Sequence, residues 1–144
     1  LDRYAAENGI EVTDAEVDVY VDNMRRGMAA RGLTAEEDLT PDERLEVDAM
    51  RRQMGYAMIR QWKINQSLHE TYGGRVIYQQ LGPEPLDAYR QHFEERQSAG
   101  DFTIEDPQMK EAFWGYFSNE DIHDFMEPGG EDEASAFSSP PWLD

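Results

Sequence analysis

The stretch TPDERLEVDAMRRQMGYAMIRQWKINQSLHET, residues 40–71, predicts one long helix. Thr40 is a good N-cap, Pro41 suits the first helical position, and Glu43 places an acid in the first turn. Gly55 disfavours a helix, but apolar side chains recur on both sides of it. We therefore expect a helix of roughly 30 residues, about 45 Å long, that contacts more than one neighbour.

Two shorter helices are expected on the N-terminal side of this stretch. Residues 1–8 have the pattern of the last turns of a helix that Gly9 ends. Thr13 and Glu16 form a capping box, in which each side chain can hydrogen-bond the backbone amide of the other. An apolar stripe at helical spacing follows, formed by Val17, Val21, Met24 and Met28. A further capping pattern, TAEE at residues 34–37, predicts a short turn.

Glycine and proline interrupt the chain after residue 71. Gly73-Gly74 and Gly82-Pro83 permit reversals of the chain, and the YGG sequence lacks the spacing of phosphate-binding glycine loops. We therefore interpret the YGG segment as a joint between helices. Over residues 76–81 we expect a helical turn, because no second strand candidate is long enough to pair with this segment.

Further helices with aromatic faces are expected beyond the joint. One should span residues 85–100, a second should follow the cap at residues 106–107, and a third should span residues 118–125, with Ser118 as its cap. We therefore predict an all-α fold, with a single helical domain over residues 1–127. It should contain five to seven helices around one long central helix, followed by a flexible acidic C-terminal tail over residues 128–144.

The composition excludes several classes of function. The 144 residues carry a net charge of −18, which disfavours nucleic-acid partners because phosphate is repelled. The absence of cysteine excludes disulfides, thiolate catalysis and cysteine-based zinc sites. No run of about 18 apolar residues occurs, so we expect no transmembrane segment. Because the sequence begins with Leu1, we expect a processed or trimmed chain.

The charge is also unevenly distributed. Residues 49–69 contain four basic side chains and no acid, whereas residues 120–133 contain seven acids and no base. Two interpretations stay open. The two segments can be separate solvated faces, or the acidic segment can dock on the basic helix, within one chain or in a dimer.

The sequence contains no motif that identifies an enzyme. His69, His92 and His123 are possible metal ligands, but none has the HExxH spacing that places two imidazoles on one helix face. Carboxylates are too abundant to single out a pair for acid–base chemistry, and no nucleophile motif occurs. We therefore predict no catalytic residue, no cofactor and no metal site. A metal-dependent hydrolase built on the three histidines is an alternative.

The methionines carry the strongest functional signal. Met50, Met54, Met58 and Trp62 lie four residues apart on the long helix, and Arg51 and Arg60 lie beside them. Thioether side chains are flexible and polarisable, so they pack in cores and also line surfaces that accept varied apolar partners. Both interpretations stay open. The functional one makes these six side chains candidate peptide-binding residues in a groove for unfolded or extended polypeptide.

The end of the sequence offers a second candidate surface. Residues 140–143, Pro-Pro-Trp-Leu, form an apolar anchor on a flexible arm. Trp142 and Leu143 are therefore candidates for docking on a partner.

One half of the chain resembles a known family. The residues GIEVTDAEVDVYVDNM, 9–24, follow a helix end and precede a loop and a long helix that contains Arg-Arg-Gln-Met and Met-Ile-Arg. This arrangement resembles the N-terminal helical region of SurA-like periplasmic chaperones and related parvulin-type foldases, over residues 1–70. The resemblance implies an all-helical peptide-binding module of the bacterial envelope without a cofactor. Nothing after Tyr72 is similar to a parvulin isomerase domain, so isomerase activity is not expected.

Taken together, these patterns favour a non-enzymatic, chaperone-like or protein-binding helical module. The resemblance implies a periplasmic location and unfolded or extended polypeptide, or a protein partner, as the ligand. The alternative is a structural or assembly subunit that docks a partner through its C-terminal arm. Homo-oligomerisation is possible with either function.

Overall fold

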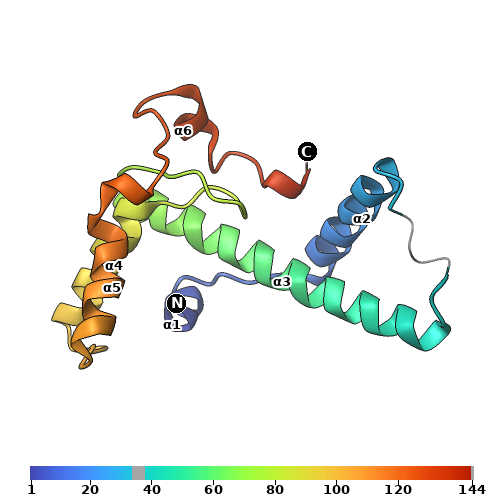
Figure 1. Ribbon diagram of the computed structural model, residues 1–144, viewed down its shortest axis with the longest axis horizontal. Coiled ribbons are helices and arrows are strands. Elements are labelled where there is room, and N and C mark those ends of the chain that lie inside the picture. Colours follow the sequence, from blue (N-terminus) through green and yellow to red (C-terminus); the bar gives the residue numbers. More distant parts are fainter. Residues whose placement is uncertain (34–37, 144) are drawn as a thin grey trace. The chain divides into compact units, whose positions relative to one another are not determined.

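The computed structural model describes residues 1–33 and 38–143 (Figure 1). Its α-helices are α1 (Asp2–Glu7), α2 (Asp14–Ala30), α3 (Pro41–Tyr72), α4 (Leu86–Ser98), α5 (Pro107–Ser118) and α6 (Glu131–Ser135). The structure also contains the 3₁₀ turns η2 (Glu120–Ile122) and η3 (Pro141–Leu143). The all-α prediction is confirmed, with six α-helices in this part of the chain. The turn predicted at residues 34–37 lies outside the described residues.

The described residues divide into two compact units, each with its own contacts. The first contains residues 1–64 and the segment from Pro140 onward, and the second contains residues 65–139. Helix α3 therefore contributes to both units. These boundaries differ from the expected division at residue 127. Among the residues described, no helix combines the length and the apolar character needed to cross a bilayer.

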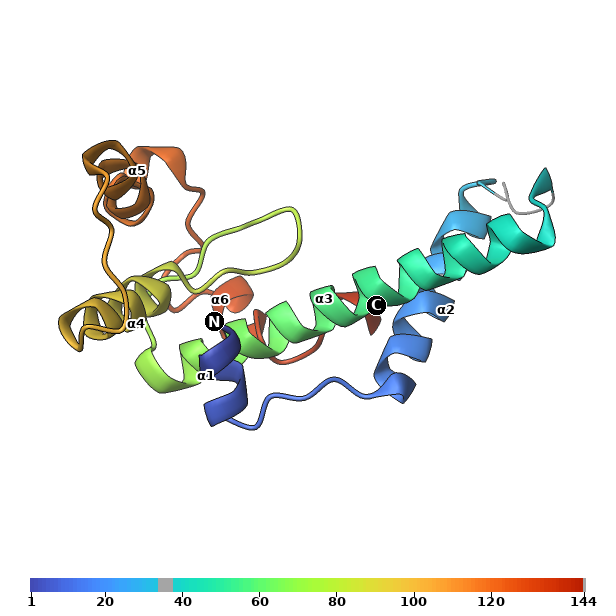
Figure 2. The same ribbon diagram turned by 90° about the horizontal axis from the view of Figure 1, so that it is seen from below.

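Local capping interactions set the start of each long helix. At α2, the Thr13 amide donates to Glu16 Oε2 (2.8 Å) and the Glu16 amide donates to Thr13 Oγ1 (3.3 Å). At α3, Thr40 and Glu43 make the same reciprocal pair at 2.8 and 3.3 Å. Both predicted caps are confirmed, and α3 has the expected length, at 32 residues. Figures 1 and 2 show α2 lying against the N-terminal half of α3.

The helical turn predicted over residues 76–81 is wrong for residues 76–79, which are not helical. Residues 80–81 lie in a turn in which the Gly82 amide donates to the Gln79 carbonyl at 3.1 Å. Val76 and Ile77 are fully buried. Ile77 and Glu84 exchange backbone hydrogen bonds of 2.9 and 3.1 Å, and Ile77 forms a second bridge with Phe125. The prediction of a helical turn assumed that a strand here would need one long partner strand. Two short bridges instead provide hydrogen bonds for the backbone of this buried segment. A single helical turn would leave more of these backbone groups without partners, and β-branched residues such as Val76 and Ile77 are less favourable in a helix.

The aromatic helices α4 and α5 pack together in the second unit. The ring centroids of Phe93 lie 5.4 Å from Phe113 and 5.8 Å from Phe117. The predicted cap by Asp106 is confirmed, since its carboxylate accepts from the amide of Gln108 at 2.8 Å.

The helix predicted over residues 118–125 is wrong. Ser118 is the last residue of α5, and Asn119 instead caps the short turn η2. Beyond it, Phe125 already takes part in the bridge with Ile77.

The segment that starts at residue 128 contains regular structure. Helix α6 forms there, and Phe137 is buried in the second unit.

The YGG segment is a joint clamped to α4. Gly73 and Gly74 have positive φ angles of 66° and 88°, which side-chain-bearing residues rarely adopt. The next residue, Arg75, donates from its backbone amide and from Nε to Asp87 Oδ2, at 2.8 and 2.9 Å. Burial raises the pKa of Asp87, but the hydrogen bonds from Arg75 outweigh it and the pKa is lowered overall. The first turn of α4 is thus fixed to the bend after α3.

The space around the two glycines differs, which gives a matched test. A Cβ at Gly74 would lie 2.5 Å from Asp87 Cβ, whereas a Cβ at Gly73 would meet nothing within 4 Å. We predict that Gly73→Ala lowers the free energy of unfolding by about 1 kcal/mol through φ strain alone. Gly74→Ala should cost about 3 kcal/mol, since a clash is added. Urea denaturation of both variants measures this, and equal losses would contradict the clamp.

Candidate functional site

The predicted stripe of Met50, Met54, Met58 and Trp62 passes from solvent into the core. The exposed fraction is 59% for Met50 and 48% for Met54, Met58 is half-buried, and Trp62 is 9% exposed. A four-residue step turns about 40° beyond a full helical turn, so three steps rotate the row by about 120°. Core packing therefore accounts for the Trp62 end of the row, and the Met50 end is exposed to solvent.

The two arginines proposed to flank a peptide already hold carboxylates. Arg51 is buried, and its guanidinium lies 3.7 Å from Asp48. Arg60 donates to Asp2 at 2.7 Å. These side chains therefore fasten the first unit together, and binding a peptide would require them to change partners.

The solvent-facing side of α3 is mostly apolar between Leu45 and Ala57, and Glu46 is an exposed, charged residue near its start. Its exposed large side chains are Leu45, Met50, Met54 and Tyr56. Ala49, Gln53 and Ala57 lie between them and are also exposed. At about 100° per residue, all seven fall within about half of the helix circumference. We call these seven residues the α3 outer face.

The opposite side of α3 packs on α2. Val17, Val21 and Ile59 form a buried cluster. Gly55 lets the two helices approach, because a Cβ there would lie 2.9 Å from the Tyr20 ring. Burial also raises the pKa of Tyr20. The close packing of the Tyr20 ring thus accounts for a glycine at position 55, inside α3.

Trp142 lies against this same core. Its ring centroid is 5.9 Å from that of Tyr20 and 5.8 Å from that of Trp62, both edge-on, and its carbonyl accepts from Asn23 Nδ2 at 2.7 Å. We call Tyr20, Asn23 and Trp62 the Trp142 seat. Of the two residues predicted to dock on a partner, Trp142 contacts its own chain and Leu143 stays exposed.

Tyr20 and Asn23 were not predicted as site residues. Their spacing of three places them on one face of α2, which the sequence does indicate. No local pattern connects that face with a tryptophan 119 residues further along the chain.

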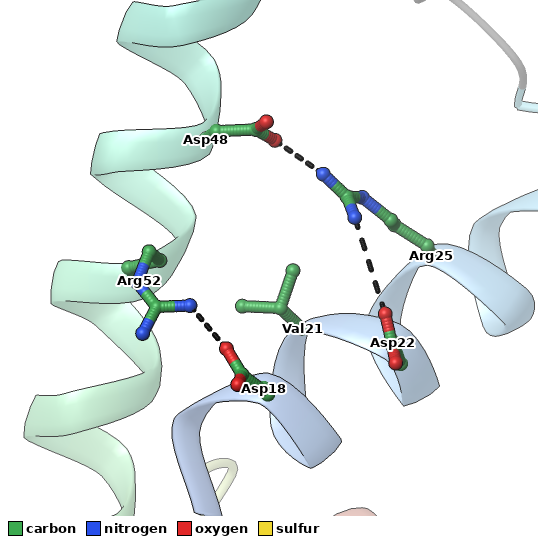
Figure 3. Close-up of a pocket in the computed structure, with 6 residues that line it drawn as sticks. All are labelled: Asp18, Val21, Asp22, Arg25, Asp48 and Arg52. Carbon is green, nitrogen blue, oxygen red and sulfur yellow. Dashed lines mark hydrogen bonds and ion pairs between the residues drawn. The ribbon is translucent and has the colours of Figure 1, made fainter. Parts of the chain in front are cut away.

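A charged cleft of about 330 Å³ opens between α2 and α3 (Figure 3). Arg25 pairs with Asp48 at 2.5 Å, and Arg52 pairs with Asp18, whose carboxylate raises the pKa of Arg52. Val21 lies between the two ion pairs in Figure 3. Because Arg25 and Arg52 each pair with a carboxylate from the other helix, we interpret the two ion pairs as a bracket across the apolar cluster.

Asp48 and Asp22 provide a matched pair for testing the bracket. Asp48 contacts Arg25 and the buried Arg51, whereas Asp22 is largely exposed and 3.9 Å from Arg25. We predict that Asp48→Ala lowers the free energy of unfolding by about 1 kcal/mol, and that Asp22→Ala changes it by less than about 0.5 kcal/mol. Urea denaturation at low salt measures both losses. Equal effects would show that the bracket does not hold α2.

Lys63 ties α3 to the start of α2. Its Nζ lies 2.6 Å from Glu16 Oε1 and donates to the Glu11 carbonyl at 2.7 Å. Hydrogen bonds from Lys63 and from the Thr13 backbone hold the pKa of Glu16 below its ordinary value of 4.5. Four basic side chains of α3 thus pair with carboxylates within the first unit: Arg51, Arg52, Arg60 and Lys63.

This low pKa predicts a pH dependence of stability. Because Glu16 is more acidic in the folded chain than in the unfolded one, its contribution is present above pH 4.5 and is lost as the pH falls through the folded-state value. Glu16→Gln should therefore flatten the decline of stability below pH 4.5. Thermal unfolding between about pH 6 and pH 3 tests this. Glu46→Gln, at an exposed position of α3, is the control and should keep the wild-type slope.

The three histidines have separate surroundings in the second unit. The His69 ring packs on Phe137, His92 lies near Tyr72, and His123 Nε2 is 2.5 Å from the Tyr116 carbonyl. Within residues 1–33 and 38–143, no group of three or more histidines and carboxylates is arranged to hold a metal ion. A wider cleft of about 520 Å³ lies beside His69.

No protein-family model, curated protein or solved structure matches the chain. The similarity to SurA-like chaperones therefore stays a prediction. The surfaces described above are the basis for inferring a function.

Proposed function

We propose that the chain is a non-enzymatic helical module that binds unfolded or extended polypeptide, and that the α3 outer face is its binding surface. The observation that carries the proposal is the exposure of Leu45, Met50, Met54 and Tyr56 along one side of one helix. In a chain with 31% charged residues and a net charge of −18, a helix face that carries no charged side chain from Ala49 to Ala57 stands out from the rest of the surface.

The chemistry of this face suits varied apolar partners. Two thioethers adapt their shape to different side chains, and the Tyr56 ring adds rigid contact area. Ala49 and Ala57 leave room for a partner backbone to approach α3 closely. The surrounding acidic surface would keep bound, partly unfolded clients in solution through charge repulsion.

The resemblance to SurA-like chaperones supports the same function and extends it to a periplasmic location. We propose that location on the resemblance alone. The assembly-subunit alternative is less well supported, because the Trp142 side chain packs on its own chain.

An aggregation assay tests the proposed surface. The chain has no cysteine, so a reductant that unfolds insulin leaves its covalent structure unchanged. We predict that the wild-type chain suppresses light scattering by reduced insulin, and that the double variant Met50→Asp, Met54→Asp loses at least about two-thirds of this effect because two apolar contacts become charged.

The control places the same two charges, also four residues apart, on exposed positions of another helix. Gln108→Asp, Ala112→Asp, on α5, should suppress aggregation as well as the wild type does. Circular dichroism establishes that each variant is folded. Full activity of the folded double variant would refute binding at the α3 outer face.

A further inference from the structure

The Trp142 seat holds a short segment of defined chemistry. Residues 140–143 form one 3₁₀ turn in which two prolines precede the tryptophan, and the Leu143 amide donates to the Pro140 carbonyl at 3.1 Å. Proline restricts the backbone before binding, so such a segment loses little conformational entropy when it docks. The first unit is therefore built to accept a proline-containing turn with an indole side chain.

Aromatic packing and one hydrogen bond hold this segment in place. The Trp142 ring packs edge-on against Tyr20 and Trp62, and Asn23 donates one hydrogen bond to its carbonyl. The neighbouring Leu143 is 51% exposed. Since the indole ring and the hydrogen bond to Asn23 are contacts that another peptide can reproduce, a second segment of the same chemistry can compete for the seat.

The seat also contains a polar group that the built-in segment leaves unsatisfied. Trp62 is 9% exposed, and within the described residues its Nε1 has no hydrogen-bond acceptor. A buried N–H without an acceptor is costly. A competing segment that placed a carbonyl oxygen beside this group would gain a hydrogen bond that residues 140–143 do not make.

We propose that the Trp142 seat is a binding site for proline-containing segments of a partner polypeptide that carry a tryptophan, and that residues 140–143 are a built-in competitor that closes it. The seat consists of different residues from the α3 outer face. It therefore adds a second and more selective surface, and it stands or falls independently of the function proposed above.

The competition has a quantitative consequence. A segment on the same chain is present at a high effective concentration, so it lowers the apparent affinity for any partner segment. The reduction equals the factor by which the closed state is favoured over the open one. Removing the built-in indole should therefore reveal the affinity of the open seat.

A labelled peptide tests the proposal on the full chain. The probe is fluorescein-labelled SSPPWL, the sequence of residues 138–143, and fluorescence anisotropy measures its binding. We predict that Trp142→Ala binds the peptide at least about ten-fold more tightly than the wild type. Adding Asn23→Ala to that variant should weaken the binding again, because the hydrogen bond to the peptide carbonyl is lost.

Two controls separate peptide binding at the Trp142 seat from non-specific binding. Leu143→Ala alters the adjacent, exposed residue and should bind the peptide as the wild type does. The peptide SSPPAL, which lacks the indole, should bind none of the variants.

Several results would overturn the proposal. Equal peptide affinity in Trp142→Ala and the wild type would exclude competition, and equal binding of SSPPWL and SSPPAL would exclude recognition of the indole. A wild-type dimer that excess SSPPWL converts to monomer would show that a second copy fills the seat, in place of the same chain.

A second measurement applies if Trp142→Ala does not fold. The chain has three tryptophans, so wild-type protein with 5-fluorotryptophan gives three ¹⁹F signals. Excess SSPPWL should shift the signals of Trp142 and Trp62, and leave that of Trp114 on α5 unchanged. Unchanged signals of Trp142 and Trp62 at millimolar peptide would also refute the proposal.

Discussion

The close contact between α2 and α3 is the interaction on which the first unit depends. Val17 and Val21 bury themselves against Ile59, and Gly55 allows the Tyr20 ring to lie on the α3 backbone. The ion pairs of Arg25 and Arg52 bracket this apolar strip and fix the rotation of α3 about its axis. Because one side of α3 is committed to α2, its other side remains open to solvent over the same turns.

This division of α3 explains both candidate surfaces. The buried side includes Trp62, which together with Tyr20 and Asn23 receives Trp142. The solvent side carries Met50 and Met54 without a charge between Ala49 and Ala57. We propose the first as a selective surface and the second as a general one. A module with both would hold varied apolar clients and distinguish one class of sequence.

Local interactions made much of the fold predictable from the sequence. The capping pairs Thr13–Glu16 and Thr40–Glu43 act over three residues, so the starts of α2 and α3 could be found directly. The extended segment at Val76 and Ile77 could not, because its backbone partners come from two separate places along the chain. The methionine stripe was identified correctly as a row. Its path from solvent to core depends on where α2 lies, which spacing on α3 alone does not show. The pairing of Trp142 with Tyr20 is equally non-local.

The central claim is that α3 presents Met50 and Met54 to solvent while it buries Trp62. Hydroxyl-radical footprinting with mass spectrometry tests this on the unmodified chain. We predict fast oxidation of Met50 and Met54 and slow oxidation of Trp62, with both methionines protected when reduced, carboxymethylated α-lactalbumin is added as an unfolded client. Slow oxidation of the two methionines in the free chain, or rates that the client leaves unchanged, would contradict the account.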